Sequence, residues 1–400
     1  MQRTHEPFLK HLSKNKTPYV IVSAEDAEFD DITLQDLRAE GFETHYVAMN
    51  DDPPTRFAER LHRIGNQLAG VNERFAVVAY GDAASALLTH HPAATSRFSA
   101  LIAYYPSTIP DPTRTSYGMD ISILVHLTGT NVNITRNQEV LGIQGKRKTV
   151  RKRIDPGLGV GGELKLAYPS YSYKGVESGF AEHDLEEYDS VAAEVAWGRT
   201  LGVLREVFGV KVDVERIKDQ FVEGMYCCGD LWSWSGQELM VNEVDVEKNP
   251  QKALASLHPE AKVVFAPTLA GGRTSSQLTQ FYENHFAPSP ASLNARLISR
   301  TIGTDRVVDE MSLSFVHDME IPWLLPLVSP THKKVEMTVV SIVKIRGGKL
   351  ETEHVYWDQA SVLVQVGLLE HGKLPVVGAD GAQAVLGRDV ELNGLLGGEG

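Results

Sequence analysis

The chain of 400 residues is 42% hydrophobic and 23% charged, which is the composition of an ordinary globular protein and excludes a disordered chain. A single hydrophobic core stops growing at roughly 250 to 300 residues, so two domains are expected. The net charge of −13 argues against nucleic acid as a bulk partner, because its phosphates would be repelled.

The expected cellular compartment and the absence of disulfide and metal chemistry follow from features that the sequence lacks. No apolar run reaches the roughly 18 residues of a membrane span and the first residues have no apolar signal core, so we expect a cytoplasmic protein without membrane association. The only cysteines, Cys227 and Cys228, are neighbours, which argues against a structural disulfide. No set of His, Asp and Glu residues has the spacing of a metal site, so no metal is expected.

The first half alternates buried strands with amphipathic helices. A strand, a helix and a second strand within about thirty residues are typical of a parallel sheet, and this pattern repeats. Strands are predicted at 18–23, 44–49, 75–80, 101–105, 121–127 and 164–168, and helices near 32–37, 56–68, 86–88 and 188–208. Residues 1–209 are therefore predicted to form a doubly wound α/β domain.

Within this domain, FAVVAYGDAAS resembles the strand and sharp turn at which the dienelactone hydrolases, an α/β-hydrolase family, place their nucleophile. The family's nucleophile, aspartate and histidine positions fall on Gly81, on Asn131 in HLTGTN and on Ser178 in GVESGF. Glycine has no side chain, asparagine does not orient an imidazole as a carboxylate would, and serine is no base at neutral pH. The resemblance implies a hydrolase-like fold with a degenerate triad. The alternative is a relocated triad that uses Asp82, His126 or His183.

A basic run is the one local exception to the acidic charge. It contains Lys146, Arg147, Lys148, Arg151, Lys152 and Arg153. We interpret it as a solvated surface loop, and a nuclear localisation signal or an anion site are the alternatives.

In the second half, helices come first and long strands follow. Helices are predicted at 214–221, 252–257 and 277–286, and strands at 263–267, 297–303, 305–318, 333–348 and 349–358. This order indicates an α+β domain over 210–378, in which a curled antiparallel sheet wraps around helices and encloses a pocket. The Gly-rich segment 379–400 is expected to be a flexible tail.

The last strand carries several side chains that handle protons. Because side chains alternate along a strand, His354, Tyr356 and Asp358 share one face, and Glu353 and Trp357 share the other. We predict that the first face lines the pocket, with Asp358 as the base and His354 and Tyr356 as partner donors. The alternative is a strand whose polar face meets solvent.

The strand predicted at 305–318 also carries a candidate histidine near its end. His317 follows the apolar row Met311, Leu313 and Phe315, so we predict that it borders the pocket, with a structural role as the alternative. The candidate substrate-binding residues are Trp323, Phe315, Glu310 and His285. The alternative is ordinary packing for Trp323 and a core or capping role for His285. Two arginines, Arg300 and Arg306, are expected to pair with the nearby acids Asp305, Asp309 and Glu310, and binding of an anionic group is the alternative.

Four segments of this half resemble the nuclear-transport-factor-2-like superfamily, in particular SnoaL-like polyketide cyclases and ketosteroid-isomerase-like proteins. The segments are FYENHF, SRTIGTDRVVDEM, FVHDMEIPW and GGKLETEHVYWDQASVLVQVG, within roughly 212–370. The resemblance implies a conical α+β barrel with a hydrophobic pocket, often in a dimer. By position, Asp358 and His317 match an aspartate and a histidine of the family.

These observations together predict an enzyme that works by acid and base catalysis without a metal, a nucleotide or another cofactor. The expected reaction is that of an isomerase, cyclase, hydrolase or lyase, and the expected substrate is an aromatic, lactone or polyketide-like small molecule. The expected assembly is a homodimer through the second domain. One alternative is an ester or lactone hydrolase that uses an unrecognised site in the first domain. The other is a non-catalytic binding or scaffold protein.

Overall fold

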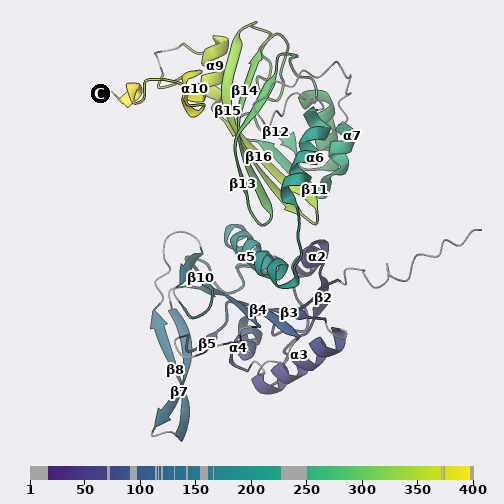
Figure 1. Ribbon diagram of the computed structural model, residues 1–400, viewed down its shortest axis with the longest axis vertical. Helices are drawn as coiled ribbons and strands as arrows, with labels where there is room; N and C mark the ends of the chain where they lie inside the picture. Colours follow the sequence, from purple (N-terminus) through teal and green to yellow (C-terminus); the bar gives the residue numbers. More distant parts are fainter. Residues whose placement is uncertain are drawn as a thin grey trace, which may run out of the picture. The chain divides into compact units, whose positions relative to one another are not determined.

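A computed structural model shows two compact units, Met1–Lys211 and Val212–Gly400, which are described separately (Figure 1). The structure describes residues 17–69, 73–90, 97–112, 115, 117–118, 120–129, 131–140, 143–153, 161–164, 166–226, 250–370, 372 and 374–396. The adjacent Cys227 and Cys228 lie outside these residues, as do the side chains of the first part of the basic run.

The first unit is built on a seven-stranded sheet with the order β2-β1-β3-β4-β6-β10-β9. Six neighbouring strands are parallel, and the edge strand β9 (Gly162–Leu164) is antiparallel to β10. The parallel strands are β1 (Tyr19–Ser23), β2 (Glu43–Tyr46), β3 (Phe75–Tyr80), β4 (Phe98–Tyr104), β6 (Ser122–Thr128) and β10 (Ser170–Tyr173).

Helices cover both faces of this sheet and give it two separate cores. Helices α2 (Asp31–Ala39) and α5 (Ser190–Phe208) pack on one face, and α3 (Pro54–Leu68) and α4 (Gly81–Thr89) on the other. Alternation along β3 explains this, because Val78 packs with α2 and α5 whereas its neighbour Val77 packs with α3 and α4. The sheet is therefore doubly wound.

Two local predictions for this unit are wrong. Residues 164–168 were expected to form a strand, but the parallel strand begins after Pro169, which lacks the N–H that a central strand position needs. The basic run is part of a strand and not of a loop. It lies on β8 (Ile143–Arg153), which pairs with β7 (Asn131–Val140), and β5 (Thr108–Pro110) completes this small sheet.

The second unit has a six-stranded sheet with the order β12-β11-β16-β15-β14-β13. The last four strands of the chain form an antiparallel meander, and β11 joins β16 in parallel. Register shifts in three of the pairings bend the sheet, as β-bulges do. The strands are β11 (Leu257–Phe265), β12 (Ala270–Gly272), β13 (Asn294–Ile302), β14 (Arg306–Val316), β15 (Lys334–Arg346) and β16 (Lys349–Trp357).

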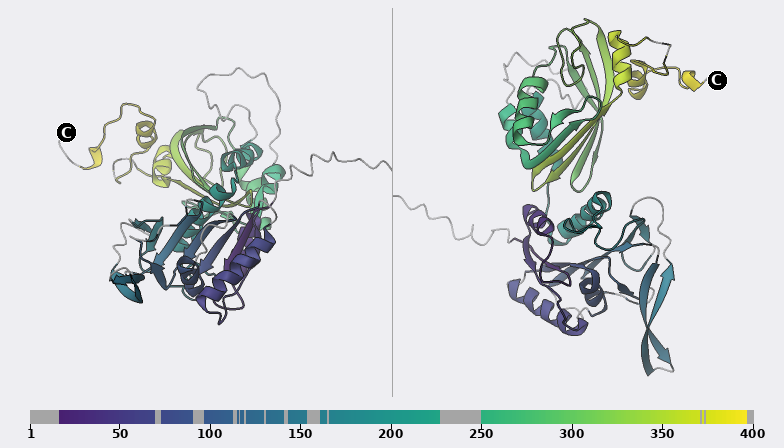
Figure 2. Two further views of the ribbon diagram at one scale, coloured as in Figure 1. Left: turned by 60° about the horizontal axis from the view of Figure 1, so that its bottom comes forward. Right: turned by 180° about the vertical axis from the view of Figure 1, so that it is seen from behind.

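Helices lie on both sides of this curled sheet (Figure 2). On one side are α6 (Val214–Tyr226), α7 (Pro250–Ala255), α8 (Ser275–Gln280) and the π-helix η1 (Phe281–Phe286). Helices α9 (Gln359–Val366) and α10 (Asp380–Val385) contact β15 from the other side. The helices and the meander thus form the α+β arrangement predicted from residue 210 onward.

The C-terminal segment differs from the flexible tail that was expected from residue 379. Helix α10 buries Ala382 against the sheet, and Arg388 forms an ion pair with Glu336 at 3.2 Å. The apolar pattern of this segment is short, which is why the sequence did not reveal it. Within the described residues, no helix has both the length and the apolar character that crossing a membrane requires.

Candidate active site

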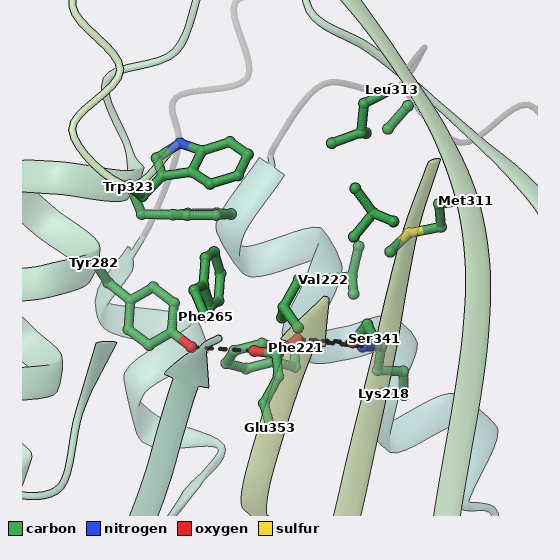
Figure 3. A pocket seen from close by; sticks show the side chains of 14 residues that line it. Lys218, Phe221, Val222, Phe265, Tyr282, Met311, Leu313, Trp323, Ser341 and Glu353 are labelled. Atoms are coloured by element: carbon green, nitrogen blue, oxygen red, sulfur yellow. Dashed lines mark hydrogen bonds and ion pairs between the residues drawn. The ribbon is translucent and has the colours of Figure 1, made fainter. Parts of the chain in front are cut away.

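The second unit contains a small apolar cavity between its helices and the sheet (Figure 3). The cavity volume is about 40 Å³, which is room for a few water-sized molecules. An aromatic ligand therefore enters only if wall side chains move. The apolar wall consists of Phe221, Val222, Phe265, Phe286, Ala295, Met311, Leu313, Trp323, Val339 and Val355.

Four polar side chains meet at one end of this cavity, away from Trp323 (Figure 3). The Lys218 ammonium of α6 donates to Ser341 Oγ of β15 at 2.9 Å and lies 3.5 Å from Glu353 Oε1 of β16. Ser341 Oγ donates to Glu353 Oε1 at 3.0 Å, and the Tyr282 hydroxyl of η1 donates to Glu353 Oε2 at 3.3 Å. Both oxygens of the Glu353 carboxylate therefore have a donor within a wall that is otherwise apolar.

The local sequence explains why these groups face the cavity. Glu353 and Val355 are two residues apart on β16, so they share the buried face of that strand. Lys218 follows the buried Val214 by four residues on α6, which places both on one helical face. Tyr282 lies on a π-helix, whose wider turn rotates the side chains relative to those of α8.

The charges of Lys218 and Glu353 are withdrawn from water, with 3% and 7% of these residues exposed. Removing one partner of a buried ion pair leaves an uncompensated charge and costs about 3–5 kcal/mol. Each charge therefore compensates the other. Transfer of a proton from Lys218 to Glu353 would create no net charge in the cavity.

A second charge cluster fixes α6 to the sheet. Arg300 of β13 donates Nε and Nη2 to the two oxygens of Asp309 at 2.7 and 2.9 Å, and Nη1 to Glu215 and Asp219 of α6 at 3.1 and 2.8 Å. Although burial opposes it, these hydrogen bonds raise the pKa of Arg300. The predicted ion pairs are confirmed for Arg300 with Asp309 and for Arg306 with Asp305.

The predicted catalytic face of β16 does not line the cavity, so its assignment to the pocket is wrong. His354 and Tyr356 are exposed, and Tyr356 has 44% of its surface in solvent. Asp358 is also exposed and is the N-cap of α9, where it accepts from the N–H groups of Ala360 and Ser361 at 3.0 and 3.2 Å. Its side chain satisfies the helix terminus. The structure therefore agrees with the alternative, in which the polar face of this strand meets solvent.

His317 is fully buried but is not among the cavity-lining residues. Its Nδ1 accepts from the Thr331 N–H at 3.2 Å and from the Thr331 hydroxyl at 3.0 Å. Burial lowers the pKa of His317, so the ring is neutral at neutral pH. These contacts fit the structural role that was the alternative for this residue.

The four predicted substrate-binding residues are separated by the structure. Trp323 lines the cavity, and Phe315 is buried in the same core without lining it. Glu310 lies on the other face of β14, where it accepts from the Ser299 hydroxyl at 2.9 Å. His285 is exposed, so neither a core role nor a binding role fits it, whereas its position in the last turn of η1 is compatible with the capping alternative. His285 lies near the end of η1, where periodicity is a weak guide, whereas Glu310 lies in the middle of β14 on the face opposite Met311 and Leu313.

The first unit has a separate polar cleft of about 760 Å³. Its walls come from the segments that follow β1, β3 and β4, from residues of β6, β7 and β8 that include Arg151, and from residues within 178–185. The chain leaves β1 toward β2 and returns to β3 on the opposite side of β1, and ligands of open α/β sheets bind at such a switch point. Of the degenerate triad positions, Gly81 and Ser178 line this cleft; the Asn131 side chain lies outside the described residues.

A carboxylate fills the space beside Gly81. Gly81 has a φ of 52°, and Glu25 Oε1 accepts from the Asp82 N–H next to it. A Cβ atom built on Gly81 would collide with the Glu25 carboxyl group. Burial raises the pKa of Glu25. The space beside Gly81 is thus filled by an acid from the segment that follows β1.

The histidines proposed for a relocated triad do not face this cleft. His126 is fully buried between the hydroxyls of Tyr173 and Thr200, at 2.9 and 3.2 Å, and burial lowers its pKa to about 3. His183 donates Nδ1–H to Asp30 at 2.7 Å, and neither residue is among the cleft-lining residues. Only Asp82 of that set lines the cleft, where it accepts from the Ser107 hydroxyl at 2.5 Å.

No protein-family model matches the chain, and no curated protein matches it. Among solved structures, it is similar to a candidate SnoaL-like polyketide cyclase from Jannaschia Sp. CCS1, at 17% identity over 39% of this chain and 92% of that one, with a TM-score of 0.28. It is similar to TsrD from Streptomyces laurentii, at 17% identity over 40% of this chain and 100% of that one, with a TM-score of 0.29. It is also similar to an NTF2-like protein from Burkholderia thailandensis E264, at 14% identity over 30% of this chain and 84% of that one, with a TM-score of 0.24. Similarity at these TM-scores does not determine an activity.

Proposed function

We propose that the second unit is a SnoaL-like, cofactor-independent enzyme of the isomerase or cyclase type, which moves protons on a small apolar carbonyl compound. The observation that carries this proposal is the network of Lys218, Ser341, Glu353 and Tyr282 at the polar end of an apolar cavity. A buried carboxylate with nearby hydroxyl and ammonium donors is suited to general base catalysis.

In this proposal Glu353 removes a proton from the carbon next to the substrate carbonyl. Negative charge then develops on the carbonyl oxygen, and a preorganised donor in an apolar site stabilises it strongly. The Tyr282 hydroxyl and the Lys218 ammonium are the available donors, since both already point to the Glu353 carboxylate. Return of the proton to another carbon completes an isomerisation, and attack of the enolate on a second carbonyl group completes a cyclisation.

Deuterium exchange tests the proposal without knowledge of the natural substrate. The protein is incubated in D₂O with cyclopentanone or with the bulkier 2-tetralone, and deuterium next to the carbonyl is measured by NMR. Wild-type protein is expected to exchange the smaller ketone faster than buffer does. Glu353→Gln is expected to lose about 10²-fold or more of that rate, because the base is removed.

Two further variants make the result decisive. His354→Gln alters the exposed neighbour on the same strand and is expected to leave the rate unchanged. Glu353→Gln leaves the buried Lys218 charge without its partner, so the double variant Lys218→Met/Glu353→Gln is also measured. Circular dichroism checks that each variant is folded. Full exchange by a folded Glu353→Gln protein would refute the role of this residue.

The small cavity volume favours a second candidate function, that of a binding protein which returns its ligand unchanged. A space of about 40 Å³ is closed to molecules larger than a few waters unless the walls move. Binding of cyclopentanone with a shift in melting temperature, but without exchange, would support this function.

For the first unit we propose a hydrolase-like fold without a catalytic nucleophile. The support is that Gly81 and Ser178 line one cleft at the switch point of a doubly wound sheet, while Glu25 fills the space beside Gly81. An active-site serine probe such as a fluorophosphonate is expected to leave this unit unlabelled. Labelling of Ser85 or Ser107 would instead favour the alternative of an unrecognised hydrolase site.

A further inference from the structure

We propose that Lys218 is a nucleophile that captures small aldehydes and ketones as an imine. This inference deepens the proposed function, because it rests on the same cavity and on a carbonyl substrate. It adds a covalent step that proton transfer by Glu353 does not require.

The position of Lys218 supports this role. Its Nζ is one of the polar atoms at the end of the cavity, and only 3% of the residue is exposed. Lysine acts as a nucleophile in its neutral amine form, and the Glu353 carboxylate in the ion pair is an acceptor for the proton that the ammonium must lose. An arginine at this position would pair with Glu353 as well or better, yet it stays protonated and is no nucleophile.

The neighbours of Lys218 supply the proton transfers that imine formation needs. Glu353 Oε1 lies 3.5 Å from Nζ and can accept its proton, and Ser341 Oγ, at 2.9 Å from Nζ and 3.0 Å from Glu353 Oε1, can relay it. Tyr282 donates to the second oxygen of the same carboxylate. A base and an acid therefore stand beside the amine.

The reaction balances without an oxidant or a reductant. After Lys218 gives a proton to Glu353, the Nζ lone pair attacks the carbonyl carbon and forms a C–N bond, while the C=O π bond breaks and the oxygen takes the proton back from Glu353. Glu353 then accepts a second proton from the nitrogen, which regains its lone pair, and passes this proton to the new hydroxyl group. The C–O bond breaks, water leaves, and the nitrogen lone pair forms the C=N bond. The protonated amine and the aldehyde thus become an iminium ion and one water molecule.

The size of the cavity sets the class of carbonyl compound. A volume of about 40 Å³ favours short aliphatic aldehydes and ketones over aromatic ones. Propanal is therefore a suitable probe.

Reductive trapping tests the proposal. The full chain is incubated with propanal and sodium cyanoborohydride, which reduces an imine to a stable propylamine, and the modified lysines are identified by peptide mass spectrometry. Lys344 is a matched internal control, because it is similarly buried, with 6% exposed, but pairs with Glu351 at 2.7 Å outside the cavity lining. Lys218 is expected to be modified at least about tenfold faster than Lys344.

A variant and a comparison complete the experiment. Lys218→Arg keeps the charge opposite Glu353 and is expected to lose the propyl group at this site while retaining its melting temperature within a few degrees. Equal labelling of Lys218 and Lys344 overturns the imine proposal. If deuterium exchange that depends on Glu353 is still observed in that case, the proposed proton-transfer function stands without an imine. Labelling of Lys218 without exchange retains the imine and removes the proton-transfer function.

Discussion

Glu353 and Asp358 are five residues apart, and this odd spacing places their carboxylates on opposite faces of the extended chain. Glu353 turns into the cavity and pairs with Lys218, whereas Asp358 turns to solvent and caps α9. Alternation separates the two faces of β16 correctly, but it does not tell which face is inside, because both carry polar residues. Val355 beside Glu353 was the available signal, since an aliphatic residue indicates the buried face.

Lys218 could not be assigned to the site from its sequence. A lysine on an amphipathic helix is nearly always solvated, and its burial here depends on the pairing of α6 with β15 and β16, which are more than a hundred residues away. Tyr282 was missed for a similar reason, because the π-helical turn that directs it is not visible as a period in the sequence. Contacts over long sequence separations thus decided the part of the site that the patterns did not predict.

The first unit contains an acid whose ionisation opposes folding. Burial raises the pKa of Glu182 to about 7 from 4.5, with a smaller contribution from the negative charges of Asp184 and Glu25. Between these pH values the folded protein binds more protons than the unfolded chain, so the contribution of Glu182 to the free energy of unfolding falls as pH rises from about 4.5 to about 7. We therefore predict that the Glu182 carboxyl group lowers the free energy of unfolding of the wild type progressively across this window, relative to a variant that lacks the carboxyl group.

Glu182→Gln removes that titration and is the direct check. The free energy of unfolding is measured with urea at a series of pH values. The difference between the variant and the wild type is expected to shift steadily in favour of the variant from pH 5 to pH 8. Tyr105, which donates to Glu182, is kept so that the packing is unchanged. Parallel stability curves for the two proteins would contradict the raised pKa.

At the scale of elements, the turn between β3 and α4 is the most constrained connection of the first unit. Gly81 has a φ of 52° at this turn, a conformation that side chains with a Cβ adopt only with strain, and Glu25 fills the space beside it. We predict that Gly81→Ala lowers the free energy of unfolding of this unit by about 1–3 kcal/mol or more. Thermal unfolding followed by circular dichroism measures it.

A second glycine provides the control for that substitution. Gly118 has open space around its Cβ position and no left-handed φ, so Gly118→Ala is expected to change stability little. Equal melting temperatures for the two variants would show that the turn tolerates a side chain.

Element types could be predicted from the sequence where the hydrophobic pattern was long. The strand FAVVAY and the helix over 188–208 are both present, because a continuous apolar run and a sustained 3.6-residue period each admit one interpretation. Strand β10, with the sequence SYSY, was missed because its serines hide the apolar signal, although Ser170 and Ser172 are fully buried.

At the scale of the whole molecule, each unit has its own hydrophobic core. The apolar residues of the second unit form one cluster from Val214 to Val366, and those of the first unit form two clusters that end at Leu204. A domain with a core of its own folds independently. We predict that residues 212–396 alone unfold cooperatively and keep the propanal labelling of Lys218.

Calorimetry compares the thermal unfolding transition of that fragment with the transitions of the full chain. Its transition is expected to coincide with one of the transitions of the full chain. A fragment that lacks a cooperative transition would show that the second unit depends on the first.

The Glu25 carboxylate beside Gly81 has an evolutionary and an engineering consequence. Since any side chain at position 81 meets Glu25, positions 25 and 81 are epistatic, and the fitness effect of one depends on the other. A single substitution to serine or cysteine at 81 carries the strain of the positive φ and also requires the Glu25 side chain to move. A paired library that also shortens residue 25 removes the second of these costs.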